Sequence, residues 1–309
     1  MRPIWALLLY LAAVFIGGAF LAPWLYWTAD GIGLMNSTWR PSFDRFVTRS
    51  LLLVALLGMW PLLRFSRLDS WHALGLARFP GWRGHVALGC LVGFGSLAIV
   101  AAGALTMGAR AWAFDPALPS VALVLPGALA TAIIVALVEE GLFRGAIFGA
   151  LRNFNHWLTA LLISSAVYSI VHFFQKVTVA PSKITWISGL ELLAKMMRGF
   201  ADQQHIVPAF FVLLLAGAIL AAAYQRTGSL HFSIGLHTGW IFVAQSYAIF
   251  TKQHSPSTHP FWGGAKMIDG WCGVIVLAPL LAWFLWGPAR PKTVQDSGVI
   301  REPLPRAEL

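Results

Sequence analysis

The chain is organised as a series of apolar runs, most close to twenty residues long, separated by short polar connections. A helix needs about 20 consecutive apolar residues to span the hydrocarbon core of a bilayer. Measured against that length, the sequence predicts membrane-spanning helices near residues 4–26, 48–65, 84–108, 121–150, 157–175, 206–225, 228–250 and 270–287. We therefore expect an all-α, polytopic membrane bundle of about eight transmembrane helices.

Residues 176–205 have a different pattern, in which apolar side chains fall on one stripe at helical spacing. The stripe consists of Trp186, Leu190, Leu193, Met197 and Phe200. Charged side chains fall mostly on the other faces, which predicts an amphipathic helix in the plane of the membrane interface. Two roles are open for it: a connector along the membrane surface, or a gate or docking surface beside a site in the bundle.

The rest of the chain indicates how the protein is organised. Residues 1–287 are expected to form a single membrane-embedded domain, followed by a disordered tail over 288–309 that is rich in proline and charge. The connection after residue 65 is basic, with Arg67, Arg78 and Arg83 beside Arg64. Basic connections stay on the cytoplasmic side, so we expect both termini in the cytoplasm. The first apolar run exceeds a typical signal-peptide core, which predicts an uncleaved helix.

Composition supports the membrane class. The 309 residues are 58% hydrophobic and 11% charged, whereas soluble domains carry about 25% charged residues. The net charge of +10 is spread over many short connections, which suits anionic lipid headgroups. Nucleic acid is therefore not expected as a partner. The two cysteines provide no disulfide framework, and the sequence has no Cys/His spacing typical of a metal site.

Two adjacent acids interrupt the apolar helix expected over 121–150. A charged side chain at bilayer depth costs about 2.5–3.5 kcal/mol, so such residues usually mark functional sites. Glu140 and Arg144 are four residues apart and share a helix face, which favours an ion pair between them. Glu139 points about 100° away, among apolar neighbours. We expect Glu140 to be structural and Glu139 to be chemical, with a partner on another helix.

A polar stripe runs along the helix expected over 157–175. It consists of Ser165, Tyr168, Ser169 and His172. Serines in membrane bundles commonly form inter-helix hydrogen bonds, and we expect that role for them here. For His172 we expect a functional role, since an imidazole accepts or donates a proton near pH 7.

The next-to-last apolar helix brings another histidine to bilayer depth. His237 has Ser233 one turn before it on the same face. Gly235 and Gly239 leave one side of this helix bare, which lets a neighbouring backbone or an extended peptide approach closely.

Glu139, His172 and His237 together provide one carboxylate and two imidazoles, the groups needed to activate a water molecule. The sequence has no H-E-x-x-H, G-x-S-x-G or S-x-x-K motif, so a nucleophile triad is not indicated. The same three side chains are equally suited to hold Zn²⁺ with one position open. Spacing alone does not decide between a metal-bound and a metal-free water.

At these positions the chain resembles the CPBP intramembrane proteases, the group that contains type II CaaX prenyl endopeptidases and bacteriocin-processing Abi proteins. The E-E-x-x-x-R, F-x-x-x-H and H-x-x-x-N motifs of that group correspond to residues 139–144, 168–172 and 237–241. Tyr168 stands in place of Phe in the second motif, and Ile241 stands in place of Asn in the third. The similarity covers about residues 120–245.

The resemblance implies an eight-helix bundle with a catalytic cavity between helices, and a glutamate-type peptidase without a cofactor, although zinc stays open. It implies that Glu139 is the base that activates water, that His172 is its partner and that His237 donates to the tetrahedral oxyanion. Supporting roles fall to Glu140, Arg144, Tyr168 and Ser233. The implied substrate is a membrane-anchored peptide or protein, cut in or near a bacterial inner (plasma) membrane.

Ile241 removes one expected oxyanion donor, and loss of such a donor lowers the rate about 10²–10³-fold. Either Ser233 or a backbone N–H near Gly239 substitutes for it, or the chain is a catalytically silent scaffold or immunity-type protein of the same fold. A proton-coupled transporter that uses the same carboxylate and histidines as a relay is a further alternative. The sequence shows no inverted repeat, which speaks against a transporter.

Overall fold

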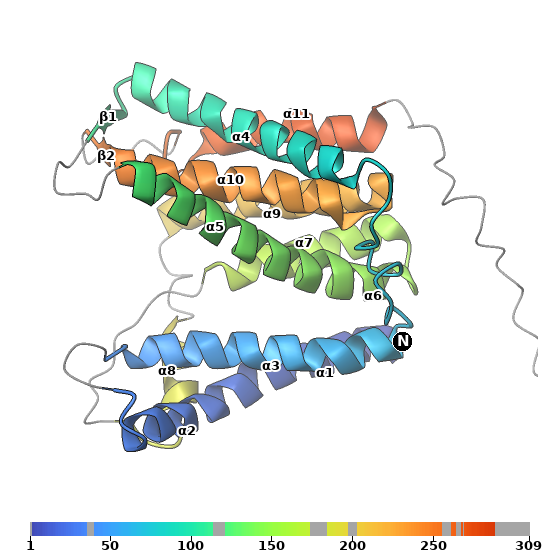
Figure 1. Ribbon diagram of the computed structural model, residues 1–309, viewed down its shortest axis with the longest axis vertical. Coiled ribbons are helices and arrows are strands. Elements are labelled where there is room, and N and C mark those ends of the chain that lie inside the picture. The colour runs from blue at the N-terminus through green and yellow to red at the C-terminus, as the bar shows by residue number, and fades with distance from the viewer. Residues whose placement is uncertain are drawn as a thin grey trace, which may run out of the picture.

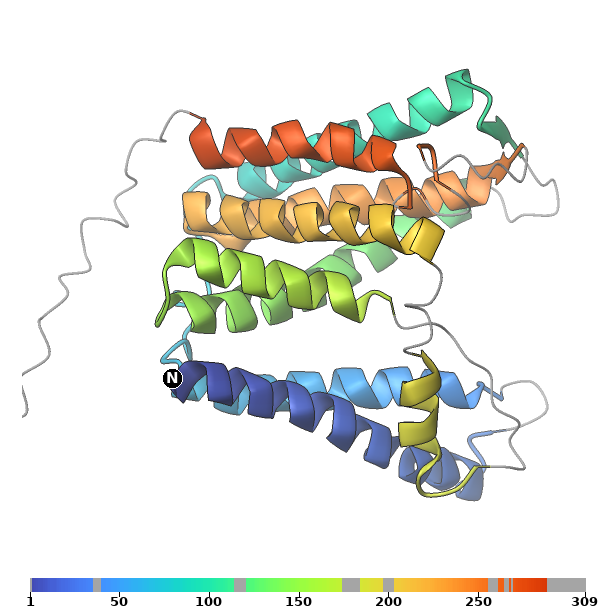
Figure 2. The same ribbon diagram turned by 180° about the vertical axis from the view of Figure 1, so that it is seen from behind.

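The described chain is built almost entirely from helices that run side by side (Figure 1). The computed structural model describes residues 2–35, 40–113, 121–173, 184–196, 203–254, 261–263, 267 and 269–287. Seen from both sides, the helices form an N-terminal group and a larger group that packs against one end of it (Figures 1 and 2). The tail expected over 288–309 lies outside the described residues.

The N-terminal group contains the first two apolar runs and one later helix. Its elements are α1 (Arg2–Ala12), the π-helical η1 (Ala13–Gly17), α2 (Gly18–Gly31), α3 (Phe43–Phe65) and α8 (Ser188–Met196). The first three follow one another without a break and pack against α3. Where α2, α3 and α8 meet, a separate core cluster forms from Ala22, Tyr26, Phe43, Val47, Leu192 and Met196.

The amphipathic helix expected over 176–205 is described only in part, and α8 is shorter than expected. Its buried residues are Ser188, Gly189, Leu192 and Met196. Trp186, which belongs to the expected apolar stripe, is exposed. The buried face differs from the expected stripe because α8 docks on α2 through Gly189. The two helices are so close there that a Cβ at Gly189 would overlap the backbone carbonyl of Ala19.

The larger group contains every other element of the described chain. Its first half consists of α4 (Trp82–Thr106), β1 (Arg110–Trp112), α5 (Val121–Glu139), the π-helical η2 (Glu140–Phe148), α6 (Gly149–Arg152) and α7 (Trp157–Val171). Its second half consists of α9 (Gln203–Thr227), α10 (Leu230–Phe250), β2 (Thr251–Gln253) and α11 (Trp271–Trp286). The two short strands pair antiparallel, with Ala111 opposite Lys252. They link the ends of α4 and α10.

Helices α4 and α10 pack along a line of glycines, here called the glycine seam. The seam consists of Gly89, Gly93, Gly235 and Gly239. A Cβ at any of these positions would overlap backbone atoms of the facing helix. Small residues let membrane helices approach this closely. The bare side of α10 expected from the sequence is therefore covered by a neighbouring backbone and is not open to a peptide.

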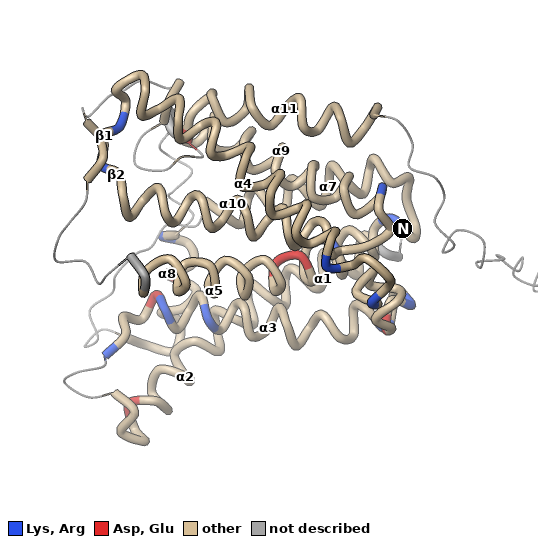
Figure 3. The backbone as a smooth tube through the Cα atoms, turned by 45° about the horizontal axis from the view of Figure 1, so that its top comes forward, with Lys and Arg blue, Asp and Glu red and all other residues tan. Residues whose placement is uncertain are grey.

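Among the described residues, five helical spans are long and apolar enough to cross a membrane by length and composition. They are Ile4–Gly31, Phe43–Phe65, Trp82–Thr106, Leu123–Arg152 and Ile206–Thr227. Trp157–Val171 and Trp271–Trp286 are shorter apolar helices. Charged positions gather mostly toward the two ends of the bundle (Figure 3). The protein is therefore an integral membrane protein with an all-helical fold.

Two of the expected helices that carry the site differ from their predicted form. The helix expected over 121–150 changes from α to π winding after Glu139, and the helix expected over 157–175 ends at Val171. An apolar pattern does not distinguish the two windings, because both bury the same kinds of side chain. The second helix ends early because His172 N–H donates to the carbonyl of Ser169, a tight i→i−3 bond that closes its last turn.

Candidate active site

The acidic pair lies at the point where α5 meets η2. The Glu140 side chain is 0% exposed and the Arg144 side chain is 2% exposed. Arg144 Nη1 donates to Glu140 Oε1 over 2.9 Å, so the ion pair expected from the spacing is present and fully buried. Arg144 Nη2 also donates to the backbone oxygen of Gly217 over 3.4 Å, which ties η2 to α9.

His237 of α10 is the second partner of Glu140. Its Nδ1 lies 2.9 Å from Glu140 Oε1, the oxygen that also faces Arg144. An ionised carboxylate only accepts hydrogen bonds, so Nδ1 carries the proton and donates it. Sequence reasoning missed this contact, because it arises only from the packing of α10 against η2.

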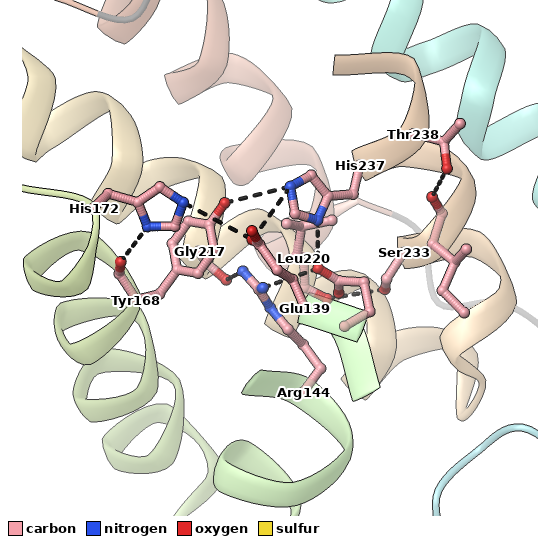
Figure 4. A network of polar contacts seen from close by, with 11 residues as sticks. Glu139, Arg144, Tyr168, His172, Gly217, Leu220, Ser233, His237 and Thr238 are labelled. Atoms are coloured by element: carbon pink, nitrogen blue, oxygen red, sulfur yellow. Dashed lines mark hydrogen bonds and ion pairs between the residues drawn. The ribbon is translucent and has the colours of Figure 1, made fainter. Parts of the chain in front are cut away.

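Glu139 faces both imidazoles (Figure 4). Its Oε2 lies 3.8 Å from His172 Nε2 and 3.8 Å from His237 Nε2, distances too long for direct hydrogen bonds. Oε2 is buried and receives no hydrogen bond from the described residues, although the side chain as a whole is 25% exposed. Polar groups at such a separation are commonly bridged by a water molecule. Glu139 Oε2 is placed to accept a proton from such a water.

His172 immediately follows α7 and is held in the same way as His237. Its Nδ1 lies 2.7 Å from the backbone oxygen of Tyr168. A carbonyl oxygen only accepts, so this Nδ1 also carries a proton. Both histidines are therefore fixed through Nδ1 and present Nε2 to one carboxylate oxygen of Glu139.

The three side chains line one cavity of about 180 Å³. Its walls are mostly apolar and come from α4, α5, α7, α9, α10 and α11. The polar part of the wall consists of Glu139, Tyr168, His172, His237 and Trp240. The cavity thus combines an apolar chamber with one cluster of titratable groups, an arrangement typical of a binding or catalytic site.

Tyr168 connects the buried ion pair to the cavity. Its ring lies under Arg144, whose Cζ is 4.4 Å from the ring centroid, and it meets the ring of Phe143 edge-on at 5.0 Å. Its hydroxyl is 3.4 Å from His237 Nε2. With Nδ1 of that histidine donating to Glu140, a neutral His237 has a lone pair at Nε2, and the tyrosine hydroxyl is the donor.

Residues 121–243 match the family described as Type II CAAX prenyl endopeptidase Rce1-like. The match runs from α5 into α10 and includes Glu139, His172 and His237. The match over these residues supports the CAAX protease family. The resemblance expected from the motifs is therefore confirmed over residues 121–243, and the apolar helices support a membrane-embedded protein. Searches of curated proteins and of solved structures gave no significant match.

Two candidate substitutes for the missing asparagine of the CAAX protease motif do not reach the cavity. Ser233 Oγ donates to the backbone oxygen of Leu220 over 3.0 Å, and this serine does not line the cavity. Gly239 faces α4 in the glycine seam, inside a continuous helix. Ile241 itself lines the cavity, one turn after His237.

The expected inter-helix role of the serines on α7 is present at one of them. Ser169 Oγ donates to the backbone oxygen of Phe210 on α9 over 3.0 Å. Ser165 packs against Gly217 of α9, and its Oγ has no hydrogen-bond partner among the described residues. The polar stripe therefore divides between helix packing and the cavity.

The distances between the three side chains show whether they could hold a zinc ion as they are placed. Tetrahedral zinc with ligand bonds of about 2.0 Å places its ligand atoms about 3.3 Å apart. Glu139 Oε2 is instead 3.8 Å from each Nε2. No group of three His, Cys, Asp or Glu among the described side chains is arranged to hold a metal ion. The Nδ1 hydrogen bonds resemble those behind metal ligands, but the side chains as placed do not fit zinc.

Proposed function

We propose that this protein is an intramembrane endopeptidase of CPBP type, which hydrolyses a peptide bond in or near the membrane with a water molecule activated by Glu139 and His172. The observation that carries the proposal is the convergence of two Nε2 atoms on one carboxylate oxygen of the cavity wall, which accepts no hydrogen bond from the described residues. The family match supports a peptidase. The apolar walls support a substrate whose cleaved bond lies beside a lipid-anchored or membrane-embedded segment.

In the proposed reaction, Glu139 Oε2 takes a proton from water, and the hydroxide bonds to the carbonyl carbon of the substrate. His237 donates from Nε2 to the oxyanion when its ring is charged, and Glu140 at Nδ1 stabilises that charge. The carbon–nitrogen bond then breaks. The proton taken from water passes to the leaving nitrogen, with His172 Nε2 beside Glu139 as its carrier.

No step of the proposed reaction passes through a metal ion. Treatment of the purified protein with 1,10-phenanthroline should leave cleavage unchanged, because Glu139 and the two histidines activate water directly. Loss of cleavage that added Zn²⁺ restores would contradict the metal-free mechanism and favour a zinc enzyme built on the same three residues.

We further propose that eight helical spans cross the membrane: α1–η1–α2, α3, α4, α5–η2–α6, α7, α9, α10 and α11. The start of α1, the connection from α3 to α4 and the end of α11 lie on one side of the bundle (Figures 1 and 2), as an even number of crossings requires. The basic α3–α4 connection supports a cytoplasmic location for that side. In this arrangement residues 1–287 form one domain that is embedded in a bacterial inner membrane. Helix α8 lies at the membrane interface, and residues 288–309 are a cytoplasmic tail.

A catalytically silent scaffold of the same fold is the second candidate function. The observation in its favour is Ile241, which places an apolar side chain in the cavity wall where the family motif has a hydrogen-bond donor. A scaffold should keep its cellular phenotype when Glu139 or His172 is replaced.

The decisive experiment compares membrane fractions of cells that carry the wild-type protein, Glu139→Gln or His172→Ala. The rate at which new peptide termini form should fall about 10²–10⁴-fold in both variants, because each variant removes a group that accepts or transfers the proton of the water. Glu191→Gln, at an exposed acid of α8, is the matched control and should leave them unchanged. Equal termini in wild type and Glu139→Gln, at equal protein levels, would refute a peptidase.

A further inference from the structure

The oxyanion formed in the proposed hydrolysis needs hydrogen-bond donors, and the described cavity wall offers few of them. Its polar side chains are Glu139, Tyr168, His172, His237 and Trp240. An ionised Glu139 only accepts, and Trp240 already donates its indole N–H to Ser96 Oγ over 2.8 Å. Both histidines commit their Nδ1 protons elsewhere, and each has a proton at Nε2 only while its ring is charged.

Tyr168 therefore carries the one permanent and loosely held proton among these side chains. Its 3.4 Å contact with His237 Nε2 is much longer than the roughly 2.8 Å of a good O–H hydrogen bond. The ring is fixed between Arg144 and Phe143, so the position of the hydroxyl is set before any substrate arrives. Figure 4 shows this hydroxyl directed toward His237, in the group of atoms that surrounds Glu139.

We propose that the Tyr168 hydroxyl is an oxyanion donor that acts beside His237, in place of the amide that Ile241 cannot supply; this role rests on the proposed peptidase function. When the hydroxide oxygen bonds to the carbonyl carbon, the π-electron pair of the carbonyl moves onto its oxygen. The hydroxyl turns to that oxygen, donates a hydrogen bond and keeps its own proton.

The release of the hydroxyl is coupled to the charge of His237. A neutral His237 accepts the hydroxyl proton at Nε2, but a charged ring has a proton there and no longer accepts. A His237 ring that is charged before the water is activated therefore donates at Nε2 and leaves Tyr168 free to be the second donor. Two departures from the family motifs, Tyr168 for Phe and Ile241 for Asn, thus compensate within one cavity.

The test is Tyr168→Phe, which removes the hydroxyl and keeps the ring against Arg144 and Phe143. Using a farnesylated peptide that ends in Cys-aliphatic-aliphatic-X, or the Glu139-dependent peptides of the membrane fraction, we expect kcat to fall about 10²–10³-fold. KM and the unfolding temperature should change little, since the lost interaction forms only in the transition state.

Tyr224→Phe is the matched control. Tyr224 is also buried, its ring lies 4.7 Å from Arg152 Cζ, and it does not line the cavity. Removal of this hydroxyl should leave kcat unchanged. A second variant adds Ile241→Asn to Tyr168→Phe and places an amide on the same wall, one turn after His237. This variant should recover about tenfold or more of the lost rate, which a merely structural hydroxyl would not allow.

The outcomes separate this role from the proposed function. Full cleavage by Tyr168→Phe, together with no cleavage by Glu139→Gln, would overturn the role of Tyr168 and leave the peptidase intact. A loss in Tyr168→Phe that Ile241→Asn does not relieve would also overturn it, in favour of a packing role. Absence of any Glu139-dependent cleavage in the wild type would overturn the peptidase and the donor role together.

Discussion

Two clusters with the same composition each include a phenylalanine of the π-helical segment η2, and they differ in what surrounds them. The inner cluster consists of Phe143, Arg144 and Tyr168. The outer cluster consists of Phe148, Arg152 and Tyr224. In each, the arginine covers the tyrosine ring, at 4.4 Å in the inner cluster and 4.7 Å in the outer one. In each, a phenylalanine meets the same ring edge-on or nearly so.

The partners of the two arginines are what differ. Arg144 faces the buried carboxylate of Glu140, whereas Arg152 donates to the neutral amide oxygen of Gln225 over 3.2 Å. The Tyr224 hydroxyl accepts from Arg152 Nη2 over 3.3 Å and lies 3.4 Å from the backbone oxygen of Ala73, and Tyr224 does not line the cavity of the candidate site. The stacked tyrosine and arginine are therefore a packing device that the fold uses twice. The inner cluster differs in having the Glu140 carboxylate, two histidines and the cavity beside it, where we propose that hydrolysis takes place.

The largest difference should follow from removal of the two arginines. Arg144→Met leaves the Glu140 carboxylate buried without its cation, which should destabilise the protein by about 3–5 kcal/mol and abolish cleavage. Arg152→Met removes hydrogen bonds to neutral acceptors and should cost about 1–1.5 kcal/mol. Denaturant unfolding in detergent measures both. Equal losses would mean that the buried charge has no special place in the inner cluster.

A smaller effect should follow from the glycine seam, which packs α10, the helix of His237, against α4. Gly239→Ala should force α10 away from α4 and cost about 1–3 kcal/mol, because its Cβ would overlap the backbone of α4. Cleavage should fall with it, since His237 moves. Gly95→Ala on α4 faces open space and is the matched control. If Gly239→Ala keeps full stability and cleavage, the seam does not position the site.

The smallest effect should come from making the outer cluster resemble the inner one. Gln225→Glu gives Arg152 a carboxylate partner, but at a part-buried place where an ion pair contributes at most about 1 kcal/mol. Cleavage should stay at the wild-type level, because Gln225 and Arg152 do not line the cavity of the candidate site. A change of cleavage in this variant would show that the outer cluster takes part in function. The measurement combines unfolding temperature with the rate of Glu139-dependent cleavage.

Local spacing was sufficient for part of the site. The pair of Glu140 with Arg144 follows from a separation of four residues, and the resemblance singled out Glu139, His172 and His237, which do meet at one cavity. The all-helical membrane fold follows from the apolar runs. The catalytic roles of these residues stay predictions until the variants are measured.

Contacts between helices could not be derived in the same way. The bond from His237 to Glu140 and the contact of Tyr168 with His237 depend on how α10 sits against η2 and α7. That placement is set by the glycine seam, whose partners lie more than a hundred residues apart. The same packing turned Ser233 toward Leu220, away from the supporting role expected at the cavity.

Because η2 is a π-helix, the number of residues in this segment affects the geometry of the site. In an α-helix each residue advances about 100° around the axis, and a π segment holds more residues per turn than the α-helix around it. Glu140–Phe148 therefore contains surplus length that a single deletion can remove without breaking the helix. Such a deletion after Arg144 would return the segment to α winding, leave the inner cluster in register and keep Phe148 and Arg152 facing Tyr224. A deletion between Glu140 and Arg144 would change their spacing from i,i+4 to i,i+3 and alter the geometry of the buried ion pair, so the position of a deletion decides whether it disturbs the inner cluster.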